Sequence, residues 1–94
     1  MPYIKPRLRR KFDESIEELL SEIKQDALLE GDNHSIDGWV NYAITKLLVG
    51  IYSPDSYFNF NRAMGTLESE KLEFYRRKVA FYEDQKCLQN GDVY

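Results

Sequence analysis

Arginine and tyrosine side chains recur together in the last third of this chain, and the combination could bind a phosphorylated base. Arginine offers paired hydrogen bonds to phosphate oxygens, and tyrosine offers a ring on which a base can stack. Asparagine amides and a tyrosine hydroxyl could read the edge of a base or ribose. The candidate ligand-binding residues are Asn41, Tyr42, Tyr57, Asn61, Arg62, Lys71, Tyr75, Arg76 and Arg77. Their types predict a site for a nucleotide-like anionic ligand.

The spacing of these residues limits what a single chain could hold. Arg62 and Arg76 are fourteen positions apart, which on one helix separates them by about 21 Å at 1.5 Å per residue. A symmetric oligomer could bring one end of this helix close to the other end of a neighbouring copy. The alternative is that the same charges pair along the helix at spacings of three or four residues. Those pairs would be Glu68 with Lys71, and Glu73 with Arg76 or Arg77.

Paired carboxylates suggest a second chemistry, hydrolysis assisted by a metal ion. All-α nucleotide pyrophosphohydrolases hold Mg²⁺ with an ExxE pair and a later ExxD pair, because carboxylates three residues apart share a helix face. The comparable residues here are Glu14 and Glu17, Glu70 and Glu73, and Glu83 with Asp84. The full signature is missing, and such pairs arise freely in an acidic chain. A hydrolase therefore stays as the alternative from another functional class.

Nucleophilic catalysis has little support in the sequence. His34 is the only histidine, and Cys87, the only cysteine, lies near the end of the chain. A Ser/His/Asp or Cys/His set is therefore not credible, and there is no glycine-rich phosphate loop. We assign no catalytic residue, no metal ligand and no cofactor, and we expect a protein that binds rather than catalyses.

Apolar residues that recur every three or four positions predict three helices. The expected fold is all-α, a small three-helix domain with a long C-terminal helix and an extended basic N-terminal arm. The helices are expected at residues 12–30, 35–51 and 56–89, and a tail follows at residues 90–94. The arm comprises residues 1–11, because Pro2 and Pro6 disfavour helix in the residues before them. Residues 1–94 form one domain.

The third expected helix carries a stripe of candidate core residues along most of its length. Gly65 lies within this helix and costs about 1 kcal/mol relative to alanine, which is acceptable if another backbone packs closely there. The stripe consists of Phe60, Met64, Leu67, Lys71, Phe74, Val79 and Tyr82, and a second line runs through Leu72, Tyr75, Val79 and Tyr82.

Positive charge is concentrated at the N-terminus of a chain whose net charge is −3. The first twelve residues hold no acid and five basic residues, which are Lys5, Arg7, Arg9, Arg10 and Lys11. The arm could contact nucleic acid or an acidic partner. Alternatively, it packs against the acidic first helix of its own chain or of a sister subunit. We favour packing, because an acidic chain repels phosphate backbones.

Aromatic residues make up 14% of the chain, which is more than one three-helix core of this size needs. Aromatic residues and arginine are common anchors of protein interfaces, so we expect a homo-oligomer. No apolar run approaches the roughly 18 residues of a membrane span. A single cysteine excludes a disulfide within the chain. We therefore expect a cytoplasmic protein with no membrane partner.

Several strings in the sequence resemble a family of short proteins of phages and bacteria. The chain begins with MPYIK, contains NYAI at residues 41–44 followed by Leu47 and Leu48, and ends with KLEFYRR and YEDQK…NGDVY. The resemblance covers most of the chain, with the variable part at residues 24–37. Phe81 is a departure, because the family usually has proline before YED. The kink that a proline would give therefore has no support in this sequence.

The resemblance implies a phage or prokaryotic accessory protein and brings no assigned chemistry. Small phage proteins often counter host defence, either by occupying a host protein or by sequestering a nucleotide signal. The leading expectation is that this protein sequesters a nucleotide-like ligand. Inhibition of a host protein, or an adaptor role on one, is the alternative.

The last residues raise the question of whether the tail docks or frays. We expect Gly91 to end the third helix in the left-handed conformation. We further expect Val93 and Tyr94 to dock in an apolar groove, and the carboxylates of Asp92 and of Tyr94 at the terminus to meet a basic group on the arm or at Arg76 and Arg77. The sequence leaves open whether residues 92–94 dock within the chain or on a partner.

Overall fold

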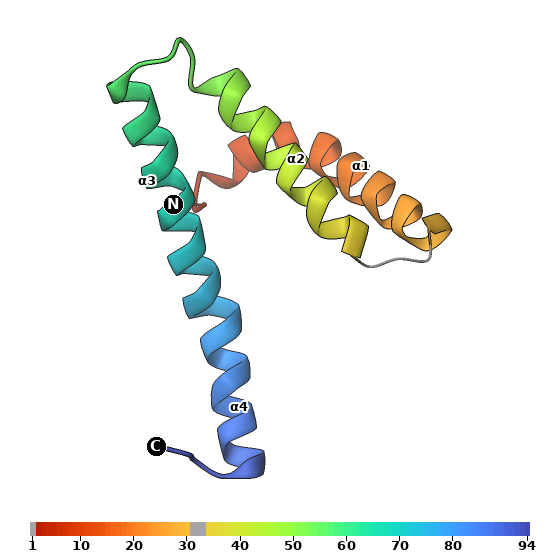
Figure 1. The fold of residues 1–94 in the computed structure, drawn as a ribbon, viewed down its shortest axis with the longest axis vertical. Coiled ribbons are helices and arrows are strands. Elements are labelled where there is room, and N and C mark those ends of the chain that lie inside the picture. Colours follow the sequence, from red (N-terminus) through yellow and green to blue (C-terminus); the bar gives the residue numbers. More distant parts are fainter. Residues whose placement is uncertain (1, 31–33) are drawn as a thin grey trace.

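The computed structural model describes residues 2–30 and 34–94, and throughout these residues the regular structure is helical. The elements are α1 (Pro6–Glu30), α2 (His34–Ile51), α3 (Tyr57–Phe74), the π-helical segment η1 (Tyr75–Val79) and α4 (Ala80–Asn90) (Figure 1). Since α3, η1 and α4 form one continuous helix, the predicted all-α, three-helix fold is confirmed. The second and third predicted helices are correct to within one residue at each end.

The predicted extended arm of residues 1–11 is too long. Helix α1 begins at Pro6, so that only residues 2–5 are extended. Proline is favoured at the first position of a helix, because its missing N–H would have no partner there anyway. The amide of Leu8 donates to the carbonyl of Lys5 at 2.8 Å, and the Arg9 side chain donates to the carbonyl of Ile4 at 2.7 Å. Proline disfavours helix in the residue before it, as expected, but here it starts one.

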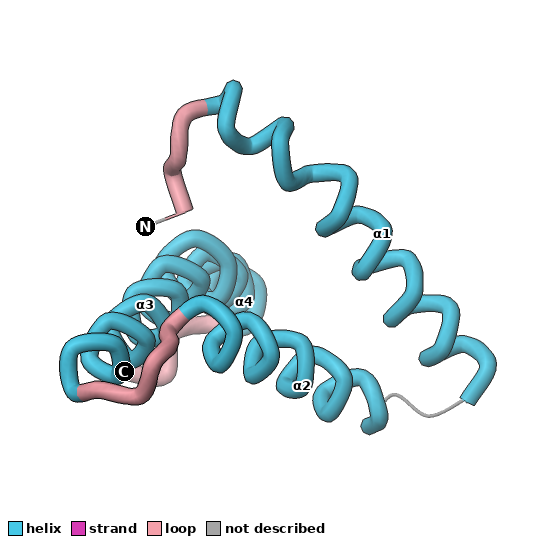
Figure 2. The backbone as a smooth tube through the Cα atoms, turned by 90° about the horizontal axis from the view of Figure 1, so that it is seen from above, coloured by secondary structure: helices cyan, strands magenta, loops and turns pink. Residues whose placement is uncertain are grey.

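Helices α1 and α2 form an antiparallel hairpin that is closed only at one end. Figure 2 shows the two helices converging toward the connection at residues 31–33 and separating toward their other ends. Ala27, near the connection, is the one buried hydrophobic residue in the described part of the chain. Farther from the connection, Phe12 and Ile16 are about half exposed, at 52% and 54%. The apolar stripe of α1 therefore lacks a facing helix over most of its length.

The long helix begins with a side-chain cap and ends at a glycine. The Ser56 hydroxyl accepts a hydrogen bond from the Asn59 amide at 3.1 Å, which satisfies one of the free N–H groups of the first turn. At the other end, Gly91 has φ 90° and ψ 148°, and its amide donates to the carbonyl of Cys87 at 2.9 Å. The positive φ was predicted, but ψ places Gly91 outside the left-handed helical region.

The shape of the chain is open rather than compact. Its radius of gyration is 17.0 Å, against about 12 Å for a compact domain of this length. The lower half of the long helix extends away from the α1–α2 hairpin (Figure 1). The predicted core of the third helix is therefore wrong for most of its length in the single chain, because among the residues of the predicted stripe only Leu67 and Val79 are even partly buried. Phe60, Met64, Phe74 and Tyr82 are 49%, 66%, 58% and 58% exposed.

Gly65 has none of the close packing that was expected there. A Cβ added at this position would meet nothing within 4 Å.

None of the described helices is both long enough and apolar enough to cross a membrane.

Candidate functional site

The start of α3 holds an arginine between two aromatic rings. The guanidinium carbon of Arg62 lies 5.4 Å from the ring centre of Tyr52 and 5.4 Å from that of Phe58. Its Nη1 also approaches Oδ1 of Asn59 at 3.4 Å. Cation–π contacts of this kind hold a guanidinium in a fixed orientation while its edge stays in water. Arg62 is thus positioned by the loop before α3 as well as by α3 itself.

Polar contacts fix that loop to the helix. The Tyr52 and Thr66 hydroxyl oxygens lie 2.8 Å apart, and the Thr66 hydroxyl donates to the carbonyl of Arg62 at 2.9 Å. The amide nitrogen of the Asn59 side chain donates to the carbonyl of Pro54 at 2.8 Å. Because the Thr66 hydroxyl already donates its hydrogen to the carbonyl of Arg62, Tyr52 is the donor in its hydrogen bond with Thr66. This bond holds the Tyr52 ring against Arg62. The ligand prediction included Arg62 but missed this supporting set, which joins the end of α2, the loop and α3.

A second polar cluster lies where α3 passes into η1. Oε1 of Glu73 accepts hydrogen bonds from Nη2 of Arg76 at 2.6 Å and from the Tyr3 hydroxyl at 2.5 Å. The Glu73 side chain is only 18% exposed, whereas Arg76 is 64% exposed. Sequence spacing predicted the pair of Glu73 and Arg76, which is confirmed. Nothing in the spacing could have predicted Tyr3, because it comes from the other end of the chain.

The charges of this cluster are coupled to one another. The hydrogen bond from Arg76, followed by the one from Tyr3, lowers the pKa of the Glu73 carboxyl below its ordinary value. The same contact with Glu73 raises the pKa of the Arg76 guanidinium. Its hydrogen bond to Glu73, followed by partial desolvation, raises the pKa of the Tyr3 phenol. Arg76 is therefore largely committed to Glu73, which reduces what it can offer to an anionic ligand.

The remaining candidates on the long helix lie apart from these two clusters. Lys71 pairs with Glu68 at 3.7 Å, as the alternative interpretation predicted, but both side chains are well exposed and such a pair contributes little. Tyr75 opens η1 and is 51% exposed. Tyr57 is 89% exposed and lines a hollow of about 410 Å³ beside the loop before α3. Asn61 is exposed in the second turn of α3.

The candidate residues of α2 form a third location. Asn41 and Tyr42 are both exposed, Tyr42 to 65%. The predicted ligand-binding residues are thus spread over the middle of α2, the start of α3 and the junction of α3 with η1. Arg62 and Arg76 stay on one continuous helix, so the separation of about 21 Å expected from their spacing holds within one chain.

An apolar groove runs between α2 and α3. Its volume is about 320 Å³, and Glu70 is the only ionisable carboxylate in its lining. The remaining lining residues are Ile44, Leu47, Leu48, Ile51, Tyr52, Thr66 and Leu67. Among the described residues Glu70 makes no ion pair. The groove therefore offers apolar surface with one negative charge beside it.

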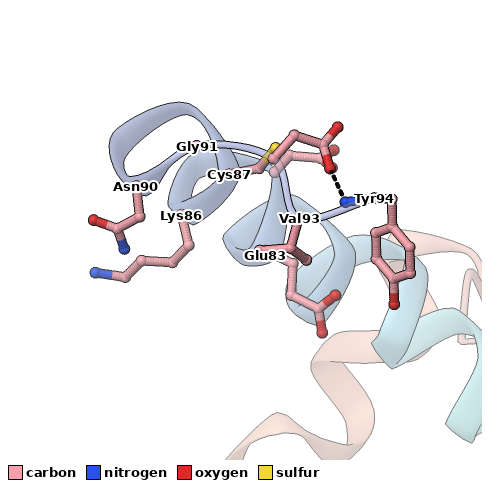
Figure 3. A pocket seen from close by; sticks show the side chains of 9 residues that line it. Glu83, Lys86, Cys87, Asn90, Gly91, Val93 and Tyr94 are labelled. Carbon is pink, nitrogen blue, oxygen red and sulfur yellow. Dashed lines mark hydrogen bonds between the residues drawn. The ribbon is translucent and has the colours of Figure 1, made fainter.

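The tail lines a second groove, of about 450 Å³, beside α4. Figure 3 shows the tail turning back next to the last turns of α4. Val93 and Tyr94 remain exposed, and Asp92 accepts a hydrogen bond from the amide of Tyr94 at 2.8 Å. Of the two predicted alternatives, docking in an apolar groove of the same chain is therefore wrong, and docking on a partner stays a prediction. Asp92 instead satisfies the local backbone, as short acidic side chains do in turns.

The acidic pairs considered for metal binding do not converge. Among the residues whose side chains the structure describes, 2–29 and 36–94, no group of three or more potential ligands could hold a metal ion. The His34 side chain lies outside the described part of the structure, and Cys87 is an exposed free thiol.

Comparison with known proteins places the chain in a family. No match was found among curated proteins or among solved structures. Residues 1–93, nearly the whole chain, match the family described as "Domain of unknown function (DUF6899)". The match agrees with the expectation of an uncharacterised family whose resemblance covers most of the chain. This chain therefore belongs to the DUF6899 family.

Proposed function

We propose that this protein is a helical association protein whose working form is a homo-oligomer, and that it acts by binding a partner rather than by catalysis. The observation that carries the proposal is its exposed surface. The chain exposes 8805 Å², whereas a compact monomer of 11.1 kDa exposes about 5,700 Å². The excess is about 3,100 Å² per chain, or about 6,200 Å² for two chains, which is enough surface for an obligate interface of 2,000 to more than 5,000 Å² counted over both partners.

The isolated lower half of the long helix supports the same proposal. Residues 75–90 continue beyond the α1–α2 hairpin (Figure 1). Helices of this length are marginal in water on their own, and their stability in proteins comes from packing of an apolar face. Phe81 and Tyr82 are 63% and 58% exposed there. Packing against another chain would supply the missing stabilisation.

Light scattering coupled to size exclusion tests this proposal. We expect a mass of at least two chains at micromolar concentration, and a melting temperature that rises with protein concentration, since association stabilises the folded state by mass action. A monomer at every concentration, with a concentration-independent melting temperature, would contradict the proposal.

Binding of a nucleotide-like anion is a second candidate function, favoured by the ordered setting of Arg62. Its guanidinium lies over Tyr52 and Phe58, which resembles the arginine and aromatic surfaces that stack on bases and bind phosphate. Arg77, beside Glu73 and Tyr3, adds positive charge at the second cluster. The ligand would be held intact rather than hydrolysed.

A thermal-shift screen with ADP-ribose and a cyclic dinucleotide checks the ligand proposal. We expect a positive shift that Arg62→Ala abolishes, and mass spectrometry of the released ligand should find it unchanged. Lys86→Ala is the matched control, because Lys86 also lies over a tyrosine ring, that of Tyr82, but outside the predicted site. No shift with either nucleotide rejects this candidate, and release of a cleaved nucleotide favours the hydrolase instead.

A role as an accessory protein in phage or bacterial cells, acting in the cytoplasm on a host component, completes the proposal. The resemblance of the sequence to phage and bacterial proteins supports it. Affinity capture from a bacterial lysate, repeated with Phe74→Ala, would test whether a host protein binds through the exposed face of the long helix. Capture that is equal with both proteins would reject that face as the host-binding surface.

A further inference from the structure

The exposed stripe of the long helix is continuous because of the π-helical segment. In an α-helix a face recurs at spacings of three and four residues, and Phe60, Met64, Leu67 and Phe74 follow this rule. The next apolar residue, Val79, is five positions after Phe74. Five is the hydrogen-bond spacing of a π-helical turn, and the amide of Ala80 donates to the carbonyl of Tyr75 in that pattern. The segment thereby keeps Val79, and Tyr82 three residues later, on the face of Phe74.

Two unlike charges lie along this stripe at equal distances from its middle. Glu70 is four residues before Phe74, and Lys78 is four residues after it. Both are exposed, and among the described residues neither makes an ion pair. Phe74 is itself close to the midpoint of the continuous helix Tyr57–Asn90. If a second copy of the stripe is laid against the first in the opposite direction, Glu70 of each copy therefore lies level with Lys78 of the other.

We infer that two copies of this chain pair antiparallel along their long helices, with Phe74 on the two-fold axis and Glu70 of each copy opposite Lys78 of the other. The inference rests on the proposed function, of which it specifies the surface. A two-fold interface brings the same patch of both subunits together. A register centred on Phe74 also overlaps the helices over nearly their full length. The two long helices then gain two ion pairs beside the paired apolar stripes, which we call the seam.

Charge favours the antiparallel arrangement over the parallel one. Parallel pairing in register would place Lys71 beside Lys71 of the partner subunit and Lys78 beside Lys78 of the partner subunit. Like charges at facing seam positions destabilise paired helices. In the antiparallel arrangement Lys78 meets Glu70, and the one like-charge level is that of Lys71 with Arg77 of the partner subunit, where Lys71 keeps its pair with Glu68 of its own chain at 3.7 Å.

The groove between α2 and α3 fits the same partner. Leu67 and Glu70 line this groove of about 320 Å³, and both lie on the N-terminal side of Phe74. Antiparallel pairing brings Val79 and Tyr82 of the partner subunit to the level of Leu67 and Glu70. Their side chains then enter the groove, while Lys78 of the partner subunit meets Glu70. An amphipathic helix binding in an apolar groove is a common mode of recognition. Residues 75–90 of one chain are thus covered by the α2–α3 groove of the other.

Charge exchange between two variants tests the register. Glu70→Lys and Lys78→Glu should each weaken the homodimer roughly tenfold, because every ion pair becomes a repulsive contact. A mixture of the two variants should form a heterodimer of near wild-type affinity, because one copy then carries two basic residues and the other two acidic residues. The double variant Glu70→Lys/Lys78→Glu should also dimerise like the wild type.

Asp84→Lys is the matched control. It makes the same charge change on the same helix, but Asp84 is two residues beyond Tyr82 and so faces away from the stripe. We expect its dimer to be unchanged. If both seam variants dimerise like the wild type, or if mixing them restores nothing, the proposed register is wrong.

The single cysteine reports the orientation without any substitution. Cys87 is exposed and thirteen residues from Phe74, so a spin label on each copy is separated by about 40 Å along the axis of an antiparallel pair. In a parallel pair the two labels lie on neighbouring helices 8–10 Å apart. A pulsed electron paramagnetic resonance distance of about 40 Å or more supports the inference, and one under about 30 Å overturns it.

These results separate the inference from the function on which it rests. A wild-type protein that assembles, but is insensitive to charge exchange or has closely spaced labels, rejects only this surface. A wild-type protein that is monomeric at every concentration rejects both.

Discussion

The Tyr3 hydroxyl donates a hydrogen bond to Oε1 of Glu73, and this contact joins residues that are seventy positions apart in the chain. It brings the short extended segment of residues 2–5 against the junction of α3 with η1. The same carboxylate oxygen accepts from Arg76 at 2.6 Å. One oxygen thus connects the N-terminal segment to the middle of the long helix.

Removal of the Tyr3 hydroxyl should release the N-terminal segment and leave the helices in place. For Tyr3→Phe we expect amide exchange at residues 3–5 to become several-fold faster, with an unchanged far-ultraviolet circular dichroism spectrum. Tyr57→Phe is the matched control, because that side chain is 89% exposed. Equal exchange rates in the wild type and in Tyr3→Phe would mean that the hydrogen bond does not hold the segment.

The Glu73 cluster should respond to acid in a defined direction. Contacts with Arg76 and Tyr3 lower the pKa of the Glu73 carboxyl from its ordinary value of 4.5. Its contribution to stability is therefore fully present above pH 4.5 and is lost as the pH falls through the lowered folded-state pKa. Carbon-13 titration by nuclear magnetic resonance should show Glu73 titrating below the solvated carboxylates. Arg76→Gln should move that midpoint upward, and a midpoint that stays in place would show that Arg76 is not the main cause.

The π-helical segment should decide which of two adjacent aromatic residues supports assembly. Because η1 places Tyr82 on the stripe, Tyr82→Ala should weaken the dimer by about 2 kcal/mol, or roughly 30-fold. Phe81→Ala should have little effect on assembly, although Phe81 is as exposed as Tyr82 in the single chain, at 63% against 58%. Sedimentation equilibrium measures both. The opposite order would indicate that this helix pairs through a regular seven-residue repeat, in which Phe81 follows Phe74.

Two glycines of the long helix should respond to alanine in opposite ways. Gly65 lies inside α3, where an added Cβ meets nothing within 4 Å, so Gly65→Ala should stabilise the helix by about 1 kcal/mol. Gly91 has φ 90° and ψ 148°, a region used almost only by glycine, so Gly91→Ala should cost about 1–3 kcal/mol at the helix end. Thermal unfolding followed by circular dichroism measures the first effect, and amide exchange at residues 87–91 measures the second. A destabilising Gly65→Ala would indicate that another chain packs closely against that position.

Much of the local structure followed from the sequence because helix formation depends on residues within a few positions of one another. The bounds of α2 and of the long helix were predicted to within one residue. The ion pairs of Glu73 with Arg76 and of Glu68 with Lys71 also followed from their spacing of three residues. The arm was the exception, because proline both disfavours helix before it and favours helix after it. Pattern reasoning weighed only the first effect.

The candidate site was less predictable, because its parts come from distant segments. Arg62 was identified by its type, but its aromatic setting depends on the loop that returns Tyr52 to α3. Docking of Val93 and Tyr94 within the chain was one of two predicted alternatives, and it does not form; Asp92 instead accepts a hydrogen bond from the amide of Tyr94. The nucleotide-like ligand stays a prediction that binding measurements can test.

The sequence by itself determined that the chain is helical, where its helices run, and which apolar stripes they carry, since these properties arise from spacings of three and four residues. Only the tertiary structure decided that most of the stripe on the long helix stays exposed in the single chain, that a π-helical segment interrupts the long helix at Tyr75–Val79, and that Tyr3 meets Glu73. The physical reason is that the spacing of apolar residues identifies which helix face must be buried, but not which segment packs against that face. That choice depends on how the helices diverge, and here it leaves most of the long helix uncovered in the single chain.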